Sequence, residues 1–180
     1  MADPLTSRAR DVVAVGRRVL EEEGPDALTM RRVANELGIR APSLYKHLPH
    51  KSALETAIIA DGFEEAAVAF EAAVDGADDP LTAFVTAYRA FASAHPHVYR
   101  LMTEGPLPRA DLPPGLEVRA AAPLLQAMGS APRARAAFAF LHGMTILELD
   151  DRFPADGQTE RAWAEGMAAF RIGAAGGLDQ

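Results

Sequence analysis

Apolar residues recur at helical spacing along most of this chain, and that periodicity limits the folds open to it. Val12, Val15 and Val19 repeat at i, i+3 and i+7 near the start, and similar patterns return further along. No stretch combines two-residue alternation with β-branched or aromatic enrichment, which a half-buried strand would show. The sequence therefore predicts an all-α protein of about nine helices.

Several classes of site are excluded by residue types that are missing. The 180 residues contain no cysteine, which removes disulfides, thiolate zinc sites and iron–sulfur clusters. The sequence has no glycine-rich phosphate loop, no G-x-S-x-G elbow and no H-E-x-x-H pair. His95 and His97 flank a proline, but two histidines fall short of the ligands that zinc needs. We therefore expect no metal, no cofactor and no enzymatic activity.

The chain offers nothing that would place it in a membrane. No apolar run approaches the roughly 20 residues that cross a bilayer, and the first residues lack the apolar core of a secretory signal. We expect a cytoplasmic protein. Its net charge of −7 is uneven, because residues 1–54 hold nine Lys/Arg against seven Asp/Glu and residues 55–180 hold nine against eighteen. A polyanion would therefore bind the first 54 residues.

These 54 residues carry the start and stop signals of a helix-turn-helix. Gly24 and Pro25 end a first helix, and Gly38 ends a short second helix that Thr29 would cap. Pro42 suits the first turn of a third helix, because its missing N–H costs nothing there. A short helix, a glycine turn and another short helix form this motif. The expected helices are Thr6–Glu23, Met30–Leu37 and one from Ala41 that is over by Pro49, before a long helix Lys51–Val74.

The third helix has few core positions. Only Leu44 and Leu48 have the spacing of buried residues. The side chains on its other faces are hydrogen-bond donors, which suit phosphates and base edges; they are Ser43, Tyr45, Lys46 and His47. A plain helical bundle is the alternative interpretation, and the donors favour DNA.

Residues 6–54 resemble the DNA-binding domain of TetR-type transcriptional regulators. The resemblance is carried by Leu28–Ile39 and Ala41–Leu54, including Gly38 at the turn and the Leu-Tyr-x-His segment of the third helix. It implies a DNA-binding domain over residues 1–54 that recognises double-stranded DNA as a palindromic operator. It places Ser43, Tyr45, Lys46 and His47 at or near the major groove and Thr29, Arg31 and Lys51 at backbone phosphates. With Arg40, Ala41 and Pro42 beside them, these are the residues that we predict to contact DNA.

Two positions depart from the common pattern of this family. Leu48 stands where Phe is usual, and Arg40 stands where a small capping residue is frequent. Leu48 changes only the packing, whereas Arg40 either contacts DNA or is a solvated turn residue. The Tyr45 ring could pack on the fourth helix while its hydroxyl reaches a phosphate.

The resemblance also implies that residues 55–180 form a helical domain that binds a ligand and dimerises. Phe84, Tyr88 and Phe91 make an aromatic stripe at i, i+4 and i+7. An apolar pocket could use this stripe, although core packing explains each candidate equally well. The pocket candidates are Phe84, Tyr88, Phe91, Met102, His142, Met144 and Trp163.

The last two long helices, expected at Pro132–Asp151 and Gln158–Gly173, are the predicted dimer interface. His142 and Gly143 are similar to the Trp-His-Gly motif of one TetR subgroup, with Leu141 in place of the Trp. Gly143 would allow helices to approach closely. The interface candidates, which could equally be internal core, are Phe138, Leu141, Thr145, Leu149, Trp163, Met167 and Phe170.

Together these features predict a dimeric one-component regulator, a repressor that an apolar small-molecule effector releases from its operator. The alternative is a dimer that binds ligands or proteins and has lost operator recognition. Its expected sign would be acidic residues or missing donors in the third helix, and this sequence shows the opposite. A small-molecule-modifying enzyme is a more distant alternative.

Overall fold

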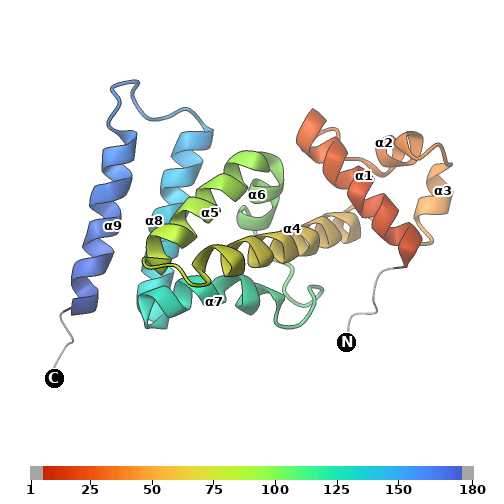
Figure 1. Ribbon diagram of the computed structural model, residues 1–180. Helices are drawn as coiled ribbons and strands as arrows, with labels where there is room; N and C mark the ends of the chain where they lie inside the picture. Colours follow the sequence, from red (N-terminus) through yellow and green to blue (C-terminus); the bar gives the residue numbers. More distant parts are fainter. Residues whose placement is uncertain (1–5, 176–180) are drawn as a thin grey trace. The chain divides into compact units, whose positions relative to one another are not determined.

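The computed structural model describes residues 6–175, and within that range all regular secondary structure is helical. The prediction of an all-α protein with about nine helices is confirmed for these residues (Figure 1). The helices are α1 (Ser7–Glu23), α2 (Met30–Glu36), α3 (Ala41–Leu44), α4 (Lys51–Val74), α5 (Pro80–Ala94), α6 (Pro96–Thr103), α7 (Leu116–Met128), α8 (Ala131–Leu149) and α9 (Thr159–Ala175). None of these helices is both long enough and apolar enough to span a bilayer.

The first two helices begin and end at residues that satisfy free backbone groups. The hydroxyl of Thr6 accepts from the Ala9 amide at 3.2 Å, and that of Thr29 accepts from the Arg32 amide at 3.1 Å. Gly38 follows α2 with a φ of 65°, and the next amide, of Ile39, donates to the Ala34 carbonyl at 3.0 Å. This left-handed glycine gives the sharp turn between α2 and α3.

The third helix is shorter than its sequence suggests, because it ends at Leu44 and continues as turns. The His47 amide donates to the Leu44 carbonyl at 2.8 Å, which is the tighter i→i+3 pattern. Pro49 disfavours helical backbone at the residue before it. The segment therefore stays compact without a second regular turn of α-helix.

The described chain forms two compact units. The N-terminal unit contains the residues up to Val68 together with Ala94–Ala120, and the C-terminal unit contains Ala69–Ser93 together with the residues from Ala121 onward. Helices α4 and α7 run through both units. These two units do not coincide with the predicted domains, which divide at residue 54. The predicted division concerns function and stays a prediction.

In the N-terminal unit two glycines let helices approach closely. A Cβ on Gly16 of α1 would lie 3.0 Å from Leu54 Cδ1 on α4. A Cβ on Gly62 of α4 would lie 2.8 Å from Val98 Cγ1 on α6. Small residues at these two points therefore hold α1 and α6 against α4.

In the C-terminal unit, α8 and α9 run antiparallel and side by side (Figure 1). They meet where Gly166 faces the Phe140 ring, which an added Cβ would overlap. The close approach expected at Gly143 does not occur within the protomer, because a Cβ there would meet open space. The glycine in the pair's packing is on α9, and the glycine of the His-Gly pair is exposed.

Candidate functional site

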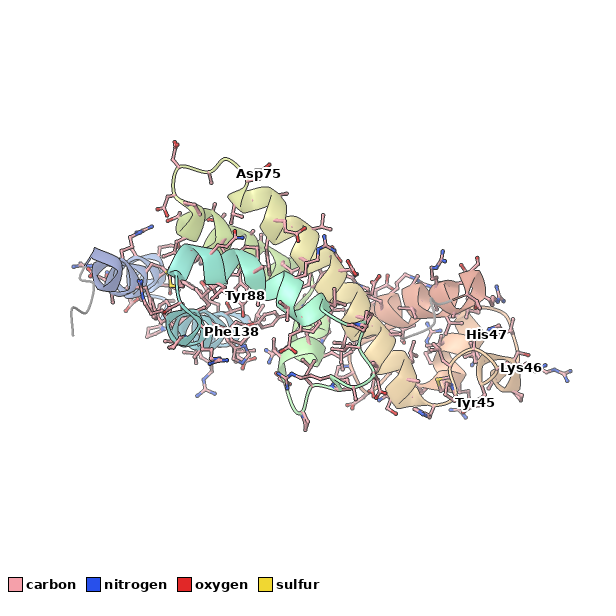
Figure 2. The ribbon with its side chains drawn as sticks, turned by 90° about the horizontal axis from the view of Figure 1, so that it is seen from below. Tyr45, Lys46, His47, Asp75, Tyr88 and Phe138 are labelled. Atoms are coloured by element: carbon pink, nitrogen blue, oxygen red, sulfur yellow. The ribbon has the colours of Figure 1, made fainter. Side chains whose placement is uncertain are left out.

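The predicted DNA-contacting residues lie on or beside α3 and are open to solvent. Nine of the ten are exposed and Ala41 is half-buried. Leu44 and Leu48 are buried beneath them and fix the segment to the rest of the head, by which we mean residues 6–54. Figure 2 shows Tyr45, Lys46 and His47 together at the outer edge of the head. These side chains are therefore accessible to a partner, and their contact with DNA stays a prediction.

The positively charged side chains of this surface are available to bind phosphates. Among the described residues, Arg31, Arg40 and Lys46 form no ion pair. Lys51, at the start of α4, has a single partner, the Glu55 carboxylate at 3.3 Å. Exposed pairs of this kind contribute little to stability. Binding a phosphate here breaks at most one weak intramolecular contact.

Two other arginines of the head form ion pairs within it. Arg32 binds both Glu23 and Glu36, with its Nη atoms 2.6 Å from each carboxylate. Arg18 of α1 binds the same Glu36 at 2.6 Å. Hydrogen bonds from Arg18 and Arg32 lower the pKa of Glu36 from its ordinary 4.5 to about 2. This network joins α1 to α2 on a surface that does not include α3.

The structure shows how exposed Tyr45 and Arg40 are, the two residues whose roles the sequence left open. Tyr45 is 50% exposed, so its ring is not buried against α4. Arg40 is exposed at the N-cap of α3, and its side chain makes no capping hydrogen bond. Both side chains are accessible to a ligand of the head.

His50 is a residue of this surface that the sequence analysis missed. Its Nδ1 accepts a hydrogen bond from the Ala53 amide at 3.1 Å and lies 2.7 Å from Ser52 Oγ. The imidazole therefore caps the N-terminus of α4, where Ser, Thr, Asp and Asn are the usual caps. The position just before Lys51 was the available signal, but histidine is not one of those capping residues.

Charged groups hold the head's first helix to α4 and α6. Arg17 of α1 binds Asp61 at 2.6 Å and also binds Glu65, both on α4. Glu65 in turn lies 3.0 Å from His95 Nε2, at the N-cap of α6.

Glu21 of α1 reaches α6 itself, and its carboxylate accepts from the Val98 amide at 2.7 Å. A carboxylate at a helix N-terminus satisfies free N–H groups and favours the helix dipole. The orientation of the head therefore depends on the position of α6.

The aromatic stripe predicted on α5 is buried in the C-terminal unit. Phe84, Tyr88 and Phe91 surround Phe70 of α4, with ring centroids 4.8, 6.0 and 6.2 Å from it. Phe70 was not among the sequence candidates, because its place in α4 gave no reason to pair it with α5. Phe138 of α8 extends this cluster, 6.3 Å from Tyr88, to the surface (Figure 2).

The other pocket candidates are not gathered in one place. Met102 belongs to the N-terminal unit, where its sulfur faces Gly62. His142 is half-buried and stacks on Phe138 with centroids 6.1 Å apart. Met144 is half-buried on α8. Trp163 is buried beside Phe140, 5.7 Å away, in a second aromatic group.

A cluster of charges lies over Trp163. The Arg89 guanidinium from α5 sits 4.6 Å from the centre of the indole ring. It binds Glu148 of α8 at 2.7 Å and Glu160 of α9 at 2.6 Å. The hydrogen bond from Arg89 also lowers the pKa of the Glu160 carboxyl below its ordinary value. Helices α5, α8 and α9 are therefore joined at this point.

Comparison with known proteins gives the same assignment for both parts of the chain. Residues 12–58 match the domain described as bacterial regulatory proteins of the tetR family. Residues 81–170, half of the chain, match the tetracyclin repressor-like C-terminal domain. The chain belongs to the TetR family. It is therefore a helix-turn-helix transcriptional regulator by family.

Relatives and solved structures agree with this TetR-family assignment. An HTH-type transcriptional regulator of Mycobacterium tuberculosis is 29% identical over 160 residues, which are 83% of this chain and 73% of the relative. A Rhodococcus protein of unknown function has the same fold, with a TM-score of 0.70, 25% identity and coverage of 92% and 95% of the two chains. The structure of BioQ with its double-stranded DNA operator gives a TM-score of 0.62 at 20% identity, covering 90% of this chain and 96% of BioQ.

The residues predicted for the dimer interface of this TetR-family protein are divided between core and surface. Leu141, Thr145, Trp163 and Met167 are buried inside the protomer. Leu149 and Phe170 are half-buried, and only Phe138 is exposed. Internal packing thus accounts for four of the seven predicted interface residues. The dimer interface itself stays a prediction.

His95 and His97 have structural partners. His95 contacts Glu65, and the His97 amide donates to Glu21 at 3.3 Å. Within the described part of the chain, no three His, Asp or Glu side chains are grouped so that they could hold a metal ion.

Proposed function

We propose that this TetR-family regulator is a cytoplasmic repressor that binds a palindromic operator as a homodimer and is released by a small molecule. The observation that carries the proposal is the surface around α3, where unpaired cations and hydrogen-bond donors are exposed together. Cations meet backbone phosphates, and donors at the centre of the surface meet base edges. The BioQ structure, which contains an operator, supports this use of the shared fold.

In the proposed complex, Ser43, Tyr45 and His47 enter the major groove. Arg31, Lys46 and Lys51 contact the phosphates on either side. α3 has only four residues, so base contacts come from its short turn and the residues just after it. A dimer would present two such surfaces to half-sites at least one helical turn apart.

Dimerisation is proposed through the outer face of α8. Ala136, Ala139, Gly143 and Leu147 recur at i, i+3, i+7 and i+11 and are all exposed. Small side chains let a second helix approach closely, and isologous contacts of this kind are usual in homodimers.

Gly143→Arg tests this interface, because open space beyond Gly143 lets the protomer accept a side chain. We expect a wild-type dimer and a folded variant monomer in sedimentation velocity, with native helicity by circular dichroism. A variant that stays dimeric would contradict this interface.

Release requires only that the effector bind one conformation better than another. The contacts of Glu21 and Arg17 support such a link, because they tie the head to α6 and α4. A shift of α6 would change the orientation of the head and hence the spacing of the two surfaces in the dimer. Release from DNA then needs no chemical step, and the effector dissociates unchanged.

The salt dependence of DNA binding tests the phosphate contacts. Lys46→Ala and Lys51→Ala should each reduce the slope of log affinity against log salt by about one unit, because each removes one phosphate contact. Arg109→Ala is the matched control, since Arg109 is exposed, lies outside the head and binds Glu117 at 2.8 Å. Fluorescence anisotropy with a labelled duplex measures the slope. Equal slopes in all four proteins would contradict the proposed DNA surface.

A further inference from the structure

Two buried polar atoms of the C-terminal unit have no hydrogen-bond partner among the described residues. They are Thr145 Oγ1 on α8 and Trp163 Nε1 on α9, and both residues are only 3% exposed. Leaving a buried donor unpaired is unfavourable, so native structures rarely keep one without a use. Two of them on adjoining helices need an explanation.

Thr145 differs from two other helical threonines of this protein. Thr86 and Thr103 donate their hydroxyls to the carbonyls four residues earlier, at 2.9 and 2.7 Å. That local bond is open to any threonine within a helix. Thr145 lies within α8, about one turn before the helix ends at Leu149, and does not make this bond. Its hydroxyl is therefore available to another group.

Both unpaired atoms belong to residues that adjoin the Arg89 cluster. Thr145 is one helical turn before Glu148, on the same face of α8, and Glu148 binds Arg89. The Arg89 guanidinium lies directly over the Trp163 ring. Its other partner, Glu160, is 76% exposed. The charged cluster thus covers one face of the indole and reaches solvent at Glu160.

The hydrogen-bonding groups, charges and aromatic rings around Thr145 and Trp163 favour one class of ligand. The indole N–H can only donate, so its partner must carry an acceptor, which an ammonium group lacks. The single positive charge of Arg89 is already bound by two carboxylates, so the cluster is net negative and repels an anion. The neighbouring groups are aromatic, namely Phe140 beside Trp163 and the cluster around Tyr88. An uncharged apolar molecule with a hydrogen-bond acceptor satisfies all three conditions.

We propose that Thr145 and Trp163 bind the polar end of an uncharged, largely apolar effector whose acceptor is a carbonyl, as in a ketone, ester or amide. Trp163 Nε1 and Thr145 Oγ1 both donate to it, and the apolar part packs on the aromatic side chains. This inference rests on the proposed function, because it names the class of the effector. The acceptor of such a ligand would give both unpaired atoms a hydrogen-bond partner.

The test compares probes with the same number of carbons and different polar ends. They are 2-decanone, decanoate and decane, added to the full-length protein without DNA. Trp163 is the single tryptophan of the chain, so its fluorescence reports binding at this place directly. We expect 2-decanone to bind at least about tenfold more tightly than decanoate or decane. Tighter binding of decanoate, or equal binding of decane, would overturn the proposal.

Thr145→Val removes the hydroxyl and keeps the shape of the side chain. We expect the affinity for 2-decanone to fall about three- to tenfold, as loss of one hydrogen bond predicts, with that for decane unchanged. The melting temperature of the ligand-free variant should rise, because an unpaired buried hydroxyl is gone. Thr86→Val is the matched control, and it should leave the affinity for 2-decanone unchanged. A Thr145→Val protein with unchanged ketone affinity would overturn the role of Thr145.

Trp163→Phe tests the indole N–H, with calorimetry in place of fluorescence. We expect the preference for 2-decanone over decane to shrink by about the same factor as in Thr145→Val, and an unchanged preference would overturn the donor role. Failure of this inference is separable from failure of the proposed function. If the protein binds an operator but no neutral probe, the inference fails alone. If 2-decanone binds as predicted and no duplex does, the DNA proposal fails alone.

Discussion

The cations around α3 have different surroundings from Arg89 and Arg171 of the C-terminal unit. Around α3, Arg31, Arg40 and Lys46 extend into solvent without an acidic partner among the described residues. In the C-terminal unit, Arg89 is bound by Glu148 and Glu160, and Arg171 is bound by Asp79. The first set can bind a phosphate without first breaking an ion pair, and the second set joins helices. Pairing, more than the number of cations, therefore separates a binding surface from a structural one.

The same difference appears inside the head. Arg32 and Arg31 are neighbours in the sequence, yet Arg32 binds two carboxylates and Arg31 binds none. Composition alone could not tell them apart. The comparison implies that changes around α3 affect DNA binding with little effect on stability, and that changes in paired or buried groups do the reverse.

The largest expected effect is that of Tyr45→Ala on operator recognition. Tyr45 is exposed at the centre of the proposed surface, so its loss should reduce the preference for operator over random DNA by about 100-fold or more. The free energy of unfolding should stay within about 0.5 kcal/mol of wild type, as for other surface substitutions. Tyr45→Phe keeps the ring, so its preference for operator over random DNA should lie between those of wild type and Tyr45→Ala. Unaltered operator preference in Tyr45→Ala would contradict the account of this surface.

Gly166→Ala should act on stability alone. The new Cβ would overlap the Phe140 ring, so we expect a loss of about 1–3 kcal/mol in the free energy of unfolding, measured in urea. The control is the same change in a Phe140→Ala background, where the ring is absent and the loss should disappear. A loss of equal size in both backgrounds would show that the contact does not set the packing of α8 on α9.

The smallest effect is expected for Glu36→Gln and depends on pH. The pKa of Glu36 is lowered to about 2 in the folded protein by Arg18 and Arg32, and returns to about 4.5 on unfolding. Its ionised form therefore stabilises the head above about pH 4.5, and that contribution is lost as the pH falls toward 2. Glu36→Gln should flatten the fall in stability over this range. Parallel curves for variant and wild type would contradict the role of the network.

Much of the fold followed from the sequence because its helices have clear ends. The bounds predicted for α4, Lys51–Val74, are those of the structure. Pro49 just before this helix and Gly76 just after it made these bounds visible. The short α3 was overestimated, because its apolar spacing continues through residues that form only turns.

The candidate sites were predictable to different degrees. The proposed DNA surface depends on residues of one local motif, so a local pattern is enough to predict it. The C-terminal unit depends on which helices meet. Periodicity showed that Leu141 and Trp163 face something apolar but not that this is the protomer's own core. Phe70 and the ion pairs of Arg89 could not be foreseen, because they join segments that are far apart in the sequence.

Selection of bound duplexes from a random pool, with the purified full-length protein at about physiological salt, tests the central claim most directly. The account predicts an enriched palindrome whose half-sites are at least one helical turn apart, and loss of that enrichment in Tyr45→Ala. Refolding the protein after dialysis under unfolding conditions removes any effector that came with it. Binding that remains blind to sequence after this step would contradict the account.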